Sequence, residues 1–305
     1  VLVECRDAVR RRQHRSASAR GGGTFTGFFT GFYPPAPEGA STAFLAGSTV
    51  QGGVFLRSST GIQPVATTAM TIPGTPFSFF SIGGPALSGG EVAFPGFAQN
   101  PAFGGVYRWQ SGSIGVVADH TTPIPGGTGL FNNFGETDIN NGVVAVAGRG
   151  AGGQSGLYLG HLGGTLERLY DTSTPEPGGS VFTLFADPSI ENGRVAFRGH
   201  TPDGVGLYTD TSGTLELLAQ TGMPEPGVPG ELFSVATGAG LDDGYVVFGA
   251  TFLGGGSGIF TNRDGPVSKI IASGDALDGR IVGSIAFNRG HDGDSIAFAV
   301  VFTDG

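Results

Sequence analysis

The stretch ENGRVAFRGHTPDGVGLYTDTSGTLELLAQ, residues 191–220, contains three short apolar runs separated by turn-forming residues. The runs are centred on Ala196-Phe197, Leu207-Tyr208 and Leu217-Leu218, and a Phe-rich run precedes them at 182–185. Each run favours β-strand, and Gly, Asn, Asp and Thr punctuate them at the spacing typical of hairpins. The stretch therefore predicts four consecutive antiparallel strands: runs A (Phe-rich), B (Ala-Phe), C (Gly-Leu-Tyr) and D (Leu-rich).

The same pattern recurs along the whole chain. The second residue of run B falls at positions 44, 94, 146, 197, 248 and 298, which are 50 to 52 residues apart. Four antiparallel strands in a unit of ~51 residues are typical of one β-propeller blade. The six units predict an all-β, six-bladed propeller. A solenoid is the alternative, but it would need polar capping repeats at both ends, and none is visible.

The two ends of the chain indicate how such a ring would close. The opening VLVECRD, residues 1–7, is similar to TLERLYD at 165–171 and is interpreted as an isolated run D. The last segment, 284–305, supplies runs A and B but no run C. A sixth blade built from both termini would remove the open sheet edges. Two alternatives remain: residues 1–7 pair with strand 294–302 of the same chain, or strand exchange with a neighbour builds a filament.

Composition and charge exclude several classes of protein. The 305 residues include 58 Gly, 19 Pro and 24 Phe, and after residue 20 no stretch without Gly or Pro exceeds 11 residues, which excludes an all-α fold. No apolar run approaches the length of a membrane span. The net charge is −9, of which residues 1–20 contribute +4, so the remainder is strongly acidic. Nucleic acid and membrane insertion are therefore not expected.

The expected domain organisation is simple. Residues 1–20 form a closing strand and a basic loop, and residues 21–305 form the propeller repeats of the same single domain. Cys5 is the only cysteine, so no disulfide within the chain is expected. It lies in a strand-like run and is interpreted as a small core residue.

Part of run B carries a short motif. Gly-x-Val-Ala-Phe is present at Gly90–Phe94 and Gly193–Phe197, with approximate copies at Gly142–Val146 and Gly244–Phe248. In this feature the units resemble a family of secreted bacterial tandem-repeat proteins named for an N-x-x-G-x-x-A-F repeat, which often carry a C-terminal sorting anchor. The Asn departs from that pattern, because Asn141 and Asn192 directly precede the glycine, and no anchor segment is recognisable. The resemblance implies an exported, surface-associated bacterial protein and brings no catalytic residue.

No catalytic, cofactor or metal site is predicted. The sequence has neither a G-x-S-x-G elbow nor an H-E-x-x-H motif. The five histidines fall at places that are not equivalent between units, so they are not expected to converge on one ion. They are His14 in the basic loop, His120 in a loop between run D and the next run A, His161 in a C–D turn, His200 in a B–C loop, and His291 in an A–B loop.

Calcium is the alternative for the acidic turns between runs A and B. These turns contain Glu191, Asp242, Asp243, Asp292 and Asp294. The segment HDGDS at 291–295 resembles a fragment of a calcium loop, but the complete pattern with its distant Glu is absent. Because Asp beside Gly is ordinary in tight turns, solvated turns are expected, and calcium at Asp292 and Asp294 remains open.

The sequence favours a non-catalytic extracellular or cell-surface structural or adhesion propeller without a cofactor, self-associating as a subunit of a surface filament. A carbohydrate-binding or carbohydrate-processing propeller is the alternative, with glycans as partners. Trp109 is the only tryptophan, and the tyrosines of run C occupy positions typical of packing. The Thr- and Ser-rich loops between runs D and A could carry O-linked sugar, although their composition is also that of simple turns.

Overall fold

A computed structural model of the chain describes residues 25, 27–28, 34–47 and 51–304. These residues form strands β1 to β27 and one 3₁₀ turn, Ala151–Gly153, with no α-helix among them, so the all-β prediction is confirmed. The chain divides into two compact units, Asp7–Asp171 (the first unit) and Thr172–Gly305 (the second unit). Cys5, His14 and the strand predicted at residues 1–7 lie outside the described residues.

The first unit contains three antiparallel sheets among its described residues. The first consists of β1 (Gly27–Phe28), β2 (Ala36–Glu38), β3 (Ser41–Gly47), β4 (Gly52–Ser58) and β5 (Gly61–Thr67). The second consists of β6 (Ser81–Ile82), β7 (Ala86–Ser88), β8 (Glu91–Phe97), β9 (Gly104–Gln110) and β10 (Ser113–Asp119). The third consists of β11 (Phe131–Asn140), β12 (Val143–Gly150), β13 (Ser155–Gly160) and β14 (Glu167–Asp171).

The second unit contains two four-stranded sheets and a final group of shorter pairings. The first sheet consists of β15 (Leu184–Glu191), β16 (Arg194–Thr201), β17 (Gly204–Thr209) and β18 (Glu216–Gln220). The second consists of β19 (Phe233–Asp242), β20 (Tyr245–Phe252), β21 (Ser257–Thr261) and β22 (Ser268–Ala272). The final group consists of β23 (Ala276–Leu277), β24 (Arg280–Ala286), β25 (His291–Asp292), β26 (Ser295–Ile296) and β27 (Ala299–Phe302).

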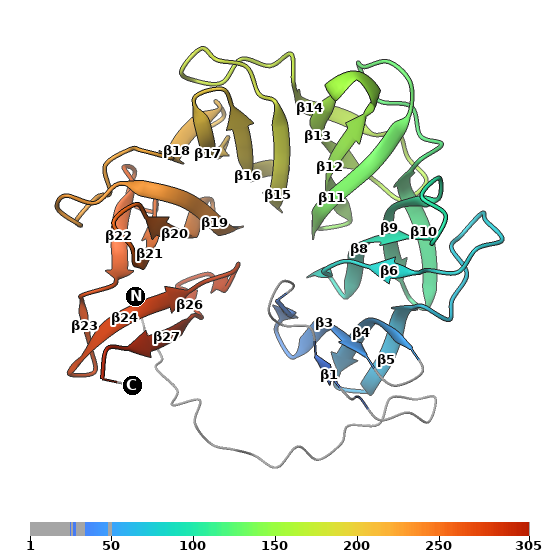
Figure 1. Cartoon of the computed structure of the whole chain (residues 1–305). Helices are drawn as coiled ribbons and strands as arrows, with labels where there is room; N and C mark the ends of the chain where they lie inside the picture. The colour runs from blue at the N-terminus through green and yellow to red at the C-terminus, as the bar shows by residue number, and fades with distance from the viewer. Residues whose placement is uncertain (1–24, 26, 29–33, 48–50, 305) are drawn as a thin grey trace. The chain divides into compact units, whose positions relative to one another are not determined.

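The order of strands within each complete sheet is the predicted order of runs A, B, C and D. In the four-stranded sheets, strands that are neighbours in the sheet are neighbours along the chain and pair antiparallel, as Figure 1 shows for β15 to β18. This meander is the strand order of a propeller blade. The final group corresponds to runs A and B, because β24 pairs with β27 and β25 pairs with β26.

Run A differs from the prediction because it is either split into two short strands or shifted in register against run B. In the first unit, β6 and β7 are two short pieces that both pair with β8. In the second unit, β15 stays continuous but its register shifts between Ala186 and Ser189, and β19 shifts between Thr237 and Gly240. Such bulges bend a strand and increase its twist, and short polar or Gly-rich segments permit them without a strong sequence signature.

The core lies between successive sheets of each unit. In the first unit, Phe94 of β8 is 0% exposed and packs in a cluster with Val54 and Leu56 of β4. In the second unit, Phe248 of β20 is 0% exposed and packs with Leu207 of β17. The repeated Ala-Phe of run B is therefore a packing signal, and the predicted burial of these phenylalanines is confirmed.

Candidate functional site

The turns between runs A and B form a regular structure. Asn141-Gly142, Asn192-Gly193 and Asp243-Gly244 all have positive φ, from 47° to 79°. Positive φ at both central residues defines the type I′ hairpin turn, which explains why Asn-Gly and Asp-Gly recur there. The last residue of run A, just before each turn, is always a polar acceptor: Glu38, Ser88, Asn140, Glu191, Asp242 and Asp292.

In both units, these acceptors bind the backbone of the following A–B turn. The Glu38 carboxylate accepts hydrogen bonds from the backbone N–H groups of Gly89 (2.6 Å) and Gly90 (3.1 Å). Glu191 accepts in the same way from the backbone of Asp243 (3.0 Å) and Gly244 (2.8 Å). We call these bonds, with the two described next, the turn relay.

Two further steps of the turn relay use shorter side chains. Asp242 accepts from the Gly293 N–H at 2.5 Å, and Ser88 Oγ accepts from the Asn141 N–H at 3.1 Å. Each bond satisfies a backbone donor that the two-residue hairpin itself leaves unpaired. The turn relay therefore links one sheet to the next at the A–B turns.

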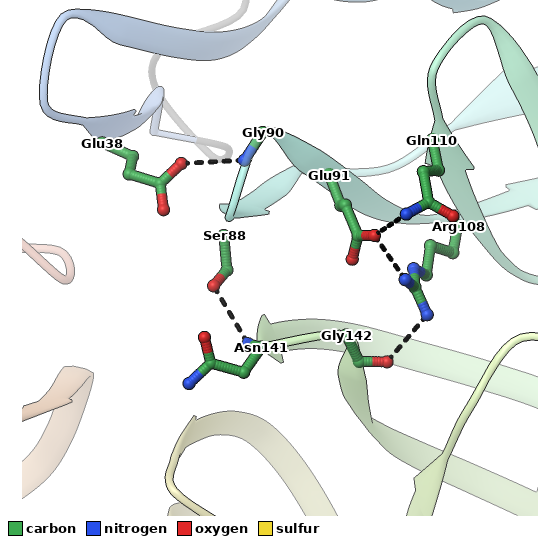
Figure 2. Close-up of polar contacts among 8 residues, drawn as sticks. All are labelled: Glu38, Ser88, Gly90, Glu91, Arg108, Gln110, Asn141 and Gly142. Atoms are coloured by element: carbon green, nitrogen blue, oxygen red, sulfur yellow. Dashed lines mark hydrogen bonds and ion pairs between the residues drawn. The ribbon is translucent and has the colours of Figure 1, made fainter.

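The step at Ser88 is reinforced by an arginine. Arg108 of β9 donates from Nη1 to the carbonyl oxygen of Gly142 at 2.9 Å and forms an ion pair with Glu91 (Figure 2). Gln110 donates to the same Glu91 carboxylate. The arginine thus holds the turn of the next sheet by its carbonyl, while Ser88 holds it by an N–H group.

The turn relay brings together three of the acidic residues that the sequence singled out. Glu191, Asp242 and Asp243 each place a carboxylate oxygen within 4.8 Å of the other two. Glu191 and Asp242 are half-buried and hydrogen-bonded to backbone, so the prediction that they are simply solvated is wrong for these two. In the sequence, Glu191 and Asp242 occupy the same position in successive repeats. That spacing alone does not show that the Glu191 side chain reaches the next A–B turn.

The other two acidic residues have different surroundings. Asp294 forms an ion pair with Arg263, whose guanidinium lies 5.2 Å over the ring of Tyr245. Asp292 is exposed at the end of β25 and is not part of the group of three. A guanidinium beside Asp294 disfavours a second cation there. Calcium prefers six to eight oxygen ligands. The carboxylates of Glu191 and Asp242 already accept hydrogen bonds from backbone N–H groups.

We expect Glu191→Ala to lower the free energy of unfolding by about 1–2 kcal/mol, since two charge-assisted hydrogen bonds are lost at a half-exposed turn. Chemical denaturation measures this loss, and Glu167→Ala, on the exposed part of β14, is the control. Millimolar calcium should leave the wild-type Tm unchanged. A rise in Tm with calcium that Glu191→Ala abolishes would show a metal site instead.

The described histidines lie apart from these carboxylates. His120 stacks on Phe134 with ring centroids 5.7 Å apart, and His161 is exposed after β13. His200 lies within β16, where it pairs with Val205, and not in the predicted B–C loop, because β16 and β17 extend as far as a tight turn. His291 lies in β25, and its Nε2 is 2.9 Å from the Gly293 carbonyl oxygen. Within the described ranges, no histidine joins a group of three ligand-type side chains.

The aromatic residues of run C serve packing. Tyr107, Tyr158 and Tyr208 are at most 2% exposed, and Trp109 is 5% exposed. Burial, with the nearby Asp171 carboxylate, raises the pKa of Tyr158 to about 12, and burial also raises the pKa of Tyr107 and Tyr208. These phenols therefore stay protonated at physiological pH and offer no ring face to a sugar.

The chain belongs to a family of unknown function, DUF7453, whose model matches residues 7–206. No curated protein matches the chain. No helix of the described residues is long and apolar enough to cross a membrane.

Several solved structures are similar at low identity. An engineered GH43 glycoside hydrolase is 12% identical over 77% of this chain and 51% of its own, with a TM-score of 0.37, so the chain spans about half of that enzyme's length. AofleA from Arthrobotrys oligospora is 13% identical over 83% of this chain and 74% of its own, with a TM-score of 0.41. The β-propeller domain of the Trilobed protease from Pyrococcus furiosus is 10% identical over 79% and 98%, with a TM-score of 0.30. These scores are too low to assign an activity.

Proposed function

We propose that this protein is a non-catalytic structural or adhesion module, exported to the cell surface, whose repeats close as a six-bladed propeller and which self-associates through its last sheet. The resemblance of run B to secreted bacterial repeat proteins supports the location. The observation that carries the proposal is the open edge of β27, which pairs only with β24 among the described residues.

The sheet that ends at β27 has one covered and one uncovered face. Val282 is 1% exposed and packs in a cluster with Val247 and Ile259 of the preceding sheet. On the opposite face, Val301 is 62% exposed and Ile281 is 45% exposed. An open edge beside exposed apolar side chains is a template for strand addition.

Residues 1–7 are the strand that we propose adds to this edge, because VLVECRD has the composition of run D. Insertion into a second copy gives a heterologous, head-to-tail contact that propagates into a filament. Insertion into the same chain gives a closed monomer instead.

A disulfide test distinguishes the two insertions. Cys5 is the only cysteine, so Ala299→Cys, in exposed β27, supplies the only partner that Cys5 can find within one chain, and the unsubstituted protein shows how much Cys5–Cys5 dimer forms between copies. A bond requires the two Cα atoms to lie within about 7 Å, as in adjacent strands. We expect mild oxidation to give covalent dimers and longer species on non-reducing gels. Ala151→Cys, exposed in the 3₁₀ turn, is the control and should give none.

Two results would contradict this proposal. A bond between Cys5 and residue 299 in the monomer, seen as an unchanged oligomeric size and a mass two hydrogens lower, would establish closure within the chain. Equal cross-linking of the 299 and 151 variants would show that residues 1–7 do not use this edge.

A further inference from the structure

The loop between runs D and A holds a buried side chain at one fixed position. In both units, this loop folds back on itself through an isolated bridge, such as Pro175 with Val181 and Pro224 with Leu232. The residue just before the Pro-Gly of the loop is buried each time: Ile72, Ile124, Glu176 and Glu225, with exposed fractions of 1%, 6%, 6% and 5%. Two loops thus bury an apolar side chain at this position, and two bury a carboxyl group.

The two buried carboxyl groups differ in their partners. Tyr208 Oη donates a hydrogen bond to Glu176 Oε2 at 3.3 Å. Neither carboxylate oxygen of Glu225 has a hydrogen-bond partner among the described residues. The position of Tyr208 is taken by Phe260, which stacks on Phe248 as Tyr208 stacks on Phe197. The hydroxyl that serves Glu176 is therefore absent for Glu225.

An unpaired carboxyl group is tolerated in such a site only when it is neutral. Met223 and Val228, on either side of Glu225, pack against the core of β19 to β22. These two contacts fix the loop to the sheet, and they require Glu225 to stay buried between them. We propose that Glu225 is a protonation switch: its neutral form holds the loop 221–232 against the sheet, and its ionised form releases the loop.

The charged groups around Glu225 support release on ionisation. Glu231, on the other arm of the loop, repels a charge on Glu225 and itself accepts from the Gly254 N–H. Lys269 of β22 lies beside Gly227, but its ammonium is paired with Asp275 at 2.8 Å. The β20–β21 turn contributes Leu253 and three glycines, and no charge.

The direction of the pH effect follows from these surroundings. Burial first, and Glu231 second, raise the pKa of Glu225 from 4.5 to about 7. While the loop is closed, Glu225 keeps its proton up to about pH 7, whereas in the released loop it loses the proton above about pH 4.5. The closed loop therefore has its full stability below about pH 4.5 and becomes less stable, relative to the released loop, as the pH rises to about 7. The shift corresponds to a roughly 300-fold change in the closing equilibrium.

Hydrogen exchange of the intact protein tests the switch. Between about pH 5 and pH 8, amide exchange in 221–232 should accelerate more than in 172–183, the loop that holds Glu176 in the same sample. Glu225→Ile, which copies Ile72 and Ile124, should remove that difference. Phe260→Tyr, which copies Tyr208, should move the release of the loop to a different pH while leaving 172–183 unchanged.

Two outcomes would overturn the proposal. One is parallel exchange of the two loops across this pH range in the wild type, which requires no variant to fold. The other is a pH-dependent difference that persists in Glu225→Ile, since it would then arise from another group.

Discussion

Replacing Phe197 by Ala is expected to lower the free energy of unfolding by about 3–5 kcal/mol, the range for deleting a buried Phe. Phe197 is 0% exposed, and its ring lies 5.4 Å from that of Phe185 and 5.7 Å from that of Tyr208. Phe185 and Tyr208 lie on β15 and β17, which both pair with β16, so they cannot move into the space without disturbing that sheet. The loss would be measured by chemical denaturation.

The control for this substitution is Phe80→Ala. Phe80 belongs to the Phe-rich run A of another repeat and is 65% exposed, so its removal should change stability by less than about 0.5 kcal/mol. Equal losses for the two variants would mean that the repeated Phe of run B has no special place in the core.

The sequence predicted the strands well because their signals are local. Run B and run C each place an aromatic residue opposite another, as Phe197 opposite Tyr208, and turn residues separate them at hairpin spacing. The period of about fifty residues then predicted that the same sheet recurs. What the period could not predict is the register, because a bulge adds one residue to a strand without changing its composition.

At the candidate site, the sequence likewise showed which residues lie in the acidic A–B turns but not which groups they contact. Glu191, Asp242 and Asp243 were visible in the sequence as a cluster of carboxylates in turns. That Glu191 reaches the backbone of the turn one repeat later depends on how closely two sheets pack, which no local pattern records. A signal was nevertheless present, since the residue that ends run A is a hydrogen-bond acceptor in all six repeats.

The buried glutamates of the D–A loops were missed for a related reason. Glu176 and Glu225 precede Pro-Gly in loops rich in Pro and Gly, and charged residues in such loops are usually solvated. Comparison between repeats contains the warning, because Ile72 and Ile124 stand at the same position. Alignment of the repeats therefore indicates burial where the composition of one loop does not.

The glycine that opens run C is a further feature that only the structure explains. An extra residue in run D shifts the register between β4 and β5, so that Val54 pairs with Ala66 but Phe55 pairs with Pro64. The bulge pushes the backbone of β5 toward Gly53, where an added Cβ would lie 2.1 Å from the Ala66 carbonyl oxygen. The same shift recurs between β9 and β10, where a Cβ on Gly105 would lie 2.3 Å from the Ala118 carbonyl oxygen.

We therefore expect Gly53→Ala to cost about 3 kcal/mol, the upper end of the usual range for overpacking, because the clash is with backbone that cannot rotate away. Gly52→Ala is a matched control one residue away: its Cβ would meet only the Ala46 carbonyl oxygen, at 3.9 Å, and its φ is not positive. Denaturant titration of both variants should show a large loss for residue 53 and little change for residue 52. Similar stabilities for the two variants would mean that the bulge in β5 can relax, and that the repeated glycine of run C does not depend on it.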